Sequence, residues 1–129
     1  MKSNELMRIL IVEDDSYVHE LLNFMLTQRT NYVITAASDG QQALDVLEEE
    51  IPGLIFLDYM LPKIDGLEVC RRIKNSDKTK HIPVIMMSAS PRLKEQTKLP
   101  LCADYYITKP FNMVEVMGIV DNIFKEGPK

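Results

Sequence analysis

Leu54-Ile55-Phe56-Leu57-Asp58 is the stretch of this 129-residue chain that decides the fold. Four consecutive apolar residues have the length of a buried strand, and an acid stands where that strand ends. The stretch Ile9-Leu10-Ile11-Val12-Glu13-Asp14-Asp15 repeats the arrangement, with an apolar run followed by acids. We therefore expect two strand ends to bring an acidic cluster to one place.

Apolar runs of strand length alternate with segments of helical period along the chain. This alternation is typical of βαβ units around a parallel sheet. It predicts an α/β fold with five strands and five helices. The expected strands are 8–12, 32–36, 54–57, 83–87 and 105–108, and the clearest helices are 16–28, 40–51, 64–74 and 113–124.

The segment between the fourth and fifth strands carries two prolines. Pro91 is acceptable in a first helical turn, whereas Pro100 must stop a helix. We therefore expect the fourth helix, within Ser90–Cys102, to be short or irregular.

Composition narrows the class of protein. A length of 129 residues with 46% hydrophobic residues predicts one domain over 1–129 with no room for an output domain. A net charge of -4 predicts no direct contact with nucleic acid. Cys70 and Cys102 lack the spacing of a metal site or a disulfide scaffold, which favours a reducing cytoplasm. No apolar stretch approaches the roughly 20 residues of a membrane span.

Polar side chains follow four of the five predicted strands. Glu13 and Asp14 follow the first strand, and Asp58 follows the third. Ser88 and Lys109 follow the fourth and the fifth. Parallel α/β sheets bind ligands at this edge, and crowded carboxylates favour a hard cation such as Mg²⁺. The set predicts a phosphoryl site in which Asp58 is the nucleophile and a lysine, a hydroxyl and Mg²⁺ contact the phosphoryl oxygens.

In this order, these residues resemble the receiver domain of two-component response regulators. The matching pieces are Ile11-Val12-Glu13-Asp14-Asp15, then Asp58 with Pro62 and Asp65-Gly66, then Met87-Ser88-Ala89, and finally Tyr106-Ile107-Thr108-Lys109-Pro110-Phe111. The whole chain is similar to the stand-alone chemotaxis type. The resemblance implies a flavodoxin-like, doubly wound sheet of strand order 2-1-3-4-5.

The resemblance also implies roles for particular residues. Asp58 would accept phosphate from a histidine kinase or a phosphotransfer protein. The other implied roles are Mg²⁺ binding by Glu13, Asp14, Asp58 and the Met60 carbonyl, phosphoryl binding by Ser88, Ala89 and Lys109, switching by Ser88 and Tyr106, and a cis bond from Lys109 to Pro110. As a monomer or weak dimer, the module would bind a downstream protein through its fourth helix, fifth strand and fifth helix.

Other interpretations of single residues stay open. Asp15 either helps to bind the metal or caps the first helix. Tyr105 competes with Tyr106 for the switch position. Met60 stands where some relatives place a polar side chain that guides water, so we expect slow self-dephosphorylation at Asp58.

Three other functions fit parts of the pattern. A phosphatase with Asp58 as nucleophile usually wants a second acid two residues on, where this chain has Met60. A flavin carrier would need hydroxyls and amides after the first strand, where acids would repel its phosphate. A receiver fold that docks partners without phosphorylation is the main alternative to the signalling module.

Overall fold

The computed structural model describes residues 6–29, 31–89 and 102–125. Its elements are β1 Met7–Val12, α1 Ser16–Leu26, β2 Tyr32–Ala37, α2 Gly40–Glu49, β3 Leu54–Asp58, α3 Gly66–Lys74, β4 Val84–Ser88, β5 Tyr105–Thr108 and α5 Met113–Lys125. The expected fourth helix falls almost wholly in 90–101, outside the described residues, so the labels pass from α3 to α5. Within the described ranges, no helix is long and apolar enough to cross a bilayer.

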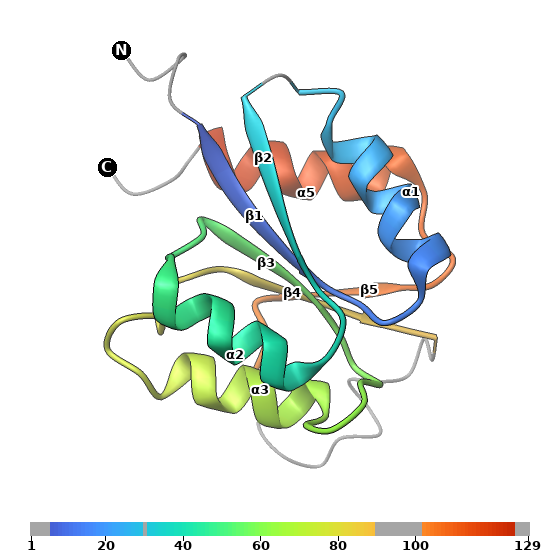
Figure 1. Cartoon of the computed structure of the whole chain (residues 1–129). Helices are drawn as coiled ribbons and strands as arrows, with labels where there is room; N and C mark the ends of the chain where they lie inside the picture. The colour runs from blue at the N-terminus through green and yellow to red at the C-terminus, as the bar shows by residue number, and fades with distance from the viewer. Residues whose placement is uncertain (1–5, 30, 90–101, 126–129) are drawn as a thin grey trace.

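The five strands form one parallel sheet in the order β2-β1-β3-β4-β5. This confirms the predicted doubly wound, flavodoxin-like topology. Helices α1 and α5 cover one face of the sheet and α2 and α3 cover the other (Figure 1). The chain winds in opposite directions from β1 and β3, which makes the carboxyl ends of these two strands the expected ligand site.

Alternate residues of the central strands pack on opposite faces of the sheet. In β1, Ile9 and Ile11 pack with α1 and α5, whereas Leu10 and Val12 pack with α2 and α3. All four are fully buried. Because a strand alternates its side chains, a sheet covered on both faces needs continuous apolar runs. This is why the strands appear in the sequence as unbroken apolar stretches.

Short polar side chains start the helices. Asp15, Asp39 and Asp65 each accept hydrogen bonds from backbone N–H groups in the first turn of α1, α2 and α3. Asn112 accepts one from the N–H of Glu115, as expected for a cap of α5. These caps satisfy N–H groups that have no partner within the helix. The α3 prediction was wrong at its start: Asp65 caps the helix, so α3 begins at Gly66 rather than at 64.

The end of α1 also differs from the predicted range 16–28. The helix ends at Leu26, and the Thr27 hydroxyl donates to the carbonyl oxygen of Asn23 at 2.7 Å. The Gln28 side-chain amide donates to the carbonyl oxygen of Phe24 at 3.1 Å. Polar side chains thus satisfy the last carbonyls and replace a further helical turn.

A polar cluster joins the turn that follows α1 to β2 and α5. The Tyr32 hydroxyl donates to Asp121 at 3.0 Å, and Arg29 donates to the same carboxylate. Burial, followed by this hydrogen bond, raises the pKa of Tyr32 from 10.0 to about 12. The protonated phenol therefore stabilises the fold below pH 10, and this contribution is lost as pH rises through about 12.

We expect wild-type protein to lose about 1 kcal/mol more stability than Tyr32→Phe when pH rises from below 10 towards 12. The value allows for the partial exposure of the ring. Urea unfolding of both proteins across this range measures the difference. Parallel curves for the two proteins would contradict the assignment.

Candidate functional site

The register of the sheet brings the predicted site residues to one edge. Val12 pairs with Leu57, which places Glu13 and Asp58 at the same level on neighbouring strands. Ser88 pairs with Thr108, so Lys109 follows directly. The Lys109 N–H donates to the Ser88 carbonyl oxygen at 2.8 Å.

Three carboxylates form a cluster at this edge. Glu13, Asp14 and Asp58 each offer an oxygen, and these atoms lie within 4.8 Å of one another. Glu13 and Asp58 are buried, at 3% and 5% exposed, whereas Asp14 is exposed. Two buried acids and one acid open to solvent give a hard, negatively charged set of oxygens. The donor set fits a divalent cation such as Mg²⁺.

Lys109 is the cation nearest to the two buried acids in the described part of the chain. Its Nζ lies 2.8 Å from Glu13 Oε1 and 3.2 Å from Asp58 Oδ1. Burial by itself lowers the pKa of Lys109, but the contacts with Glu13 and Asp58 outweigh burial and raise this pKa above its ordinary value. Lys109 is therefore charged at neutral pH and offsets the negative charge of both acids.

Glu13 is held from two sides. Burial raises the pKa of its carboxyl, and the ion pair with Lys109 and the hydrogen bond from the N–H of Asp15 partly oppose this. The Asp15 N–H donates to Glu13 Oε2 at 3.1 Å. The carboxylate of Asp15 itself accepts from the N–H of Tyr17 at 2.9 Å and serves as the cap of α1. Asp15 thus contributes to the site through its backbone.

The other predicted site residues lie around the cluster at different depths. Met60 is 72% exposed, in the loop that follows Asp58. Ser88 is buried and Ala89 is exposed. The peptide bond between Lys109 and Pro110 is cis.

Tyr106 is half-buried and packs with residues on the α2 and α3 face of the sheet. Its hydroxyl accepts a hydrogen bond from the N–H of Ala103 at 3.3 Å. Ala103 precedes β5, so the ring reaches back towards the start of this strand. The competing candidate, Tyr105, is more exposed, at 39%.

Gly66 is a site residue whose importance the sequence did not reveal. A Cβ atom at this position would lie 2.3 Å from the Asp58 carbonyl oxygen and 2.9 Å from Cα of Tyr59. The Gly66 N–H also donates to the Tyr59 carbonyl oxygen at 3.0 Å. The first turn of α3 therefore rests directly on the backbone that carries Asp58. In the sequence, Gly66 stood out only as part of the matching piece Asp65-Gly66, which carried no role of its own.

We expect Gly66→Ala to lower the free energy of unfolding by about 1–3 kcal/mol, because backbone must move to admit the methyl group. Gly118→Ala is the matched control. A Cβ atom at position 118, within α5, meets nothing within 4 Å, so alanine is expected to be neutral or stabilising there. Urea unfolding measures both variants, and equal midpoints would contradict the close packing at Gly66.

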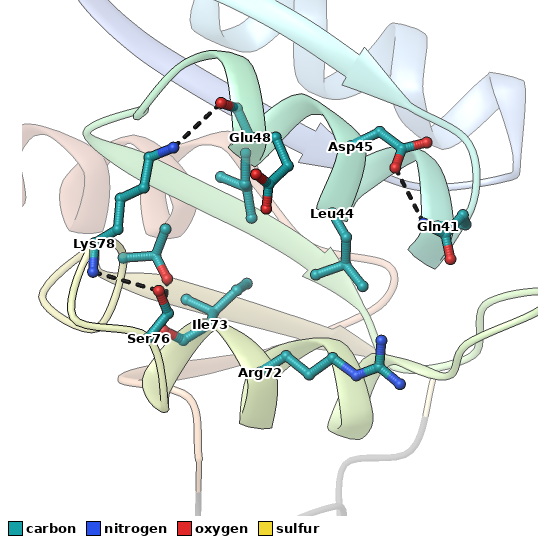
Figure 2. A pocket seen from close by; sticks show the side chains of 10 residues that line it. Gln41, Leu44, Asp45, Glu48, Arg72, Ile73, Ser76 and Lys78 are labelled. Atoms are coloured by element: carbon teal, nitrogen blue, oxygen red, sulfur yellow. Dashed lines mark hydrogen bonds between the residues drawn. The ribbon is translucent and has the colours of Figure 1, made fainter.

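A cavity of about 360 Å³ lies between α2 and α3, away from the acidic cluster (Figure 2). Several of its polar side chains already bond to one another or to backbone. Lys78 Nζ donates to the Glu48 carbonyl oxygen at 3.2 Å, and the Gln41 amide donates to Asp45 at 3.0 Å. Acids and bases are mixed in its wall, and nothing in it selects a ligand by charge.

The sequence profile of the response regulator receiver domain matches residues 9–121, and the chain belongs to this family. Members of the family are signalling modules of two-component systems rather than enzymes in the usual sense.

Three known proteins show how broad the similarity is. The alkaline phosphatase synthesis transcriptional regulatory protein PhoP of Bacillus subtilis is 40% identical over 92% of this chain and 48% of its own length. The chain thus spans about half the length of the curated relatives it matches. The signal receiver domain of a histidine kinase from Syntrophus aciditrophicus is 30% identical, with a TM-score of 0.86 over 95% of this chain and 93% of that one.

The third is the receiver domain of the sensor histidine kinase PA1611 from Pseudomonas aeruginosa, at 27% identity. Its TM-score is 0.82 over 91% of this chain and 96% of that one. That structure holds a magnesium ion coordinated in its active site cleft.

Proposed function

We propose that Asp58 accepts a phosphoryl group from the phosphohistidine of a histidine kinase or a phosphotransfer protein. The observation that carries this proposal is the position of Lys109, whose Nζ contacts both buried carboxylates, Glu13 and Asp58, beside exposed Asp14. An incoming phosphoryl group is anionic, so a site made of acids alone would repel it. A fixed lysine beside a cation site removes this obstacle.

Glu13, Asp14 and Asp58, with the backbone carbonyl of Met60, would hold Mg²⁺. When bound, the ion offsets the negative charge of the phosphoryl group and of the acids around it. Asp58 attacks phosphorus through a carboxylate oxygen. The new O–P bond replaces the N–P bond of phosphohistidine, whose ring is protonated on its other nitrogen, so the N–P electron pair stays on the ring and neutral imidazole leaves.

The remaining residues bind the product and transmit its presence. Lys109, the Ser88 hydroxyl and the Ala89 N–H contact the phosphoryl oxygens. Ser88 moves towards the new group and Tyr106 turns into the space that it leaves. The downstream protein binds the changed surface on β5 and α5, together with the expected fourth helix, a prediction that falls outside the described residues. We place this signalling in the cytoplasm.

The sequence supports the receiver family more strongly than it supports any one type of response regulator. The pattern favours a stand-alone chemotaxis receiver, whereas PhoP of Bacillus subtilis is a transcriptional regulator about twice as long as this chain. The curated relatives therefore do not support the chemotaxis type. We propose only that the receiver itself contacts proteins, whichever output it serves.

The test is phosphorylation by acetyl phosphate, followed by intact-mass measurement. We expect one hydroxylamine-labile phosphoryl group per chain in Mg²⁺, little in EDTA, and none in Asp58→Asn. Continuous turnover of general phosphate esters would favour the phosphatase instead. A protein that stays unmodified in Mg²⁺ would favour the docking module and refute the proposal.

The exposed side chain of Met60 bears on the lifetime of the phosphorylated state. It has no group that can orient water towards the phosphoryl phosphorus. We expect slow self-dephosphorylation in the wild type and a loss several times faster in Met60→Asn, measured as the decay of the phosphorylated mass. A variant that keeps its phosphoryl group as long as the wild type would contradict this role.

A further inference from the structure

The loop that follows Asp58, residues 59–65, contains a strained turn. The Ile64 N–H donates to the Pro62 carbonyl oxygen at 2.8 Å, which closes a three-residue γ-turn around Lys63. Lys63 has a φ of 69°, and it is the one non-glycine residue with positive φ in the described part of the chain. A γ-turn of this hand is rare and unfavourable by itself. Contacts from elsewhere must therefore hold the loop in place.

The first residue of α2 supplies one such contact. A Cβ atom on Gly40 would lie 2.4 Å from the Ile64 carbonyl oxygen and 2.9 Å from the Ile64 Cβ atom. It would also lie 2.9 Å from Val69 in α3. Only glycine lets the start of α2 approach the loop this closely.

Asp39, the cap of α2, supplies a second contact. Its carboxylate accepts from the N–H of Gln42 at 2.8 Å, and its other oxygen lies 3.5 Å from Lys63 Nζ. Asp39 is buried, whereas the Lys63 side chain is largely exposed. The turn is thus tied to the start of α2 by charge at Lys63 and by packing at Ile64.

The loop is held from its other end by α3. Gly66 packs on the Asp58 carbonyl and donates to Tyr59. The short segment that includes Met60 is therefore fixed between the first residue of α2 and the first residue of α3.

We propose that Gly40, Asp39 and Lys63 are positioning residues for the divalent cation site. They touch neither the ion nor the phosphoryl group. They hold the loop that carries the backbone carbonyl of Met60, the ligand that the proposed site takes from this loop. The inference rests on the proposed function, because the cation site is part of that function. Replacing a residue that orients a metal ligand typically weakens metal affinity by about 10- to 100-fold.

The test is a Mg²⁺ titration of the full chain by calorimetry, with amide NMR spectra as a second readout. We expect Gly40→Ala to raise the Mg²⁺ dissociation constant by about tenfold. Gly118→Ala, where a Cβ atom meets nothing within 4 Å, should bind as the wild type does. The amide resonances of residues 59–65, apart from Pro62, should shift in the spectrum of Gly40→Ala. They should stay unchanged in that of Gly118→Ala.

Lys63→Gly separates positioning from stability. Glycine relieves the unfavourable φ, so the urea midpoint should stay the same or rise. The freed loop must be ordered again when the ion binds, so the dissociation constant should rise about fivefold, as for fixing about one backbone residue. A purely structural role would move stability and affinity in the same direction.

Asp39→Asn keeps the cap of α2 and removes only the charge, so it should weaken Mg²⁺ binding less than Gly40→Ala does. If Gly40→Ala does not fold, Lys63→Gly decides the question. If the wild type binds Mg²⁺, and Gly40→Ala and Lys63→Gly bind it with the same affinity as the wild type, the inference is overturned and the proposed function is not. Wild-type protein that binds no Mg²⁺ would overturn both the inference and the proposed function.

Discussion

Replacing Lys109 with methionine is expected to destabilise the metal-free protein by about 3 kcal/mol at neutral pH. The side chains of Glu13 and Asp58 are only 1% and 7% exposed, and both contact Lys109 Nζ. Without the lysine, two buried acids face each other with no positive charge in contact with them in the part of the chain that the structure describes. Urea unfolding in EDTA measures the loss.

Lys63→Met is the matched control for this variant. Lys63 also pairs with a buried acid, Asp39. The Lys63 side chain, however, is 68% exposed, and its Nζ lies 3.5 Å from Asp39 Oδ2. A surface ion pair of this kind contributes about 0–1 kcal/mol. If the two lysine variants lose the same stability, Lys109 does not hold the two acids as we describe.

Magnesium should reverse much of the loss in Lys109→Met. A bound dication supplies the positive charge that the variant lacks, and a ligand that binds only the folded state stabilises it. We therefore expect Mg²⁺ to raise the unfolding midpoint of Lys109→Met by more than that of the wild type. An equal rise in both proteins would show that Lys109 and the bound cation do not offset the charge of the same acids.

Asp14→Asn is expected to raise the Mg²⁺ dissociation constant by about 100-fold or more, because it removes a charged ligand rather than a residue that orients one. Phosphorylation by acetyl phosphate should fall with it. Asp14 is exposed, and its replacement should leave folding stability almost unchanged. Calorimetric titration gives the affinity, and urea unfolding gives the stability.

Asp15→Asn is the control that separates the two neighbouring acids. Asparagine caps a helix as well as aspartate does, so α1 should remain intact. Because the Asp15 side chain accepts from Tyr17 and Val18 N–H groups, Mg²⁺ affinity should not change by more than about twofold. Equal losses in Asp14→Asn and Asp15→Asn would show that both acids bind the ion.

The parts of the fold that depend on short-range patterns were predictable from the sequence. A strand buried on both faces must be continuously apolar, as Leu54–Leu57 is, and Asp58 at its end marked the edge of the sheet. The predicted starts of α1, α2 and α5 match the structure, whereas the predicted start of α3 at 64 missed its cap, Asp65. The strand order came from the resemblance to receiver domains, because apolar runs alone do not say which strands are neighbours.

Contacts between distant segments were the part that the sequence could not reveal. The fit of Gly40 against Ile64 depends on the distance between α2 and a loop 24 residues away in the chain. Lysine has no preference for positive φ, so nothing local indicated the turn at Lys63. The resemblance implied a place for Lys109 at the phosphoryl site of Asp58, but its shorter contact with Glu13 depends on how the ends of β1 and β5 approach each other.

Mapping the modified residue tests the central claim most directly. Protein treated with acetyl phosphate and Mg²⁺ is reduced with borohydride, which converts a phosphorylated aspartate to homoserine, and is then digested and sequenced by mass spectrometry. We predict homoserine at position 58 and unmodified residues at positions 13 and 14. Modification at either of those acids, or a phosphoryl group that persists in Asp58→Asn, would contradict the account.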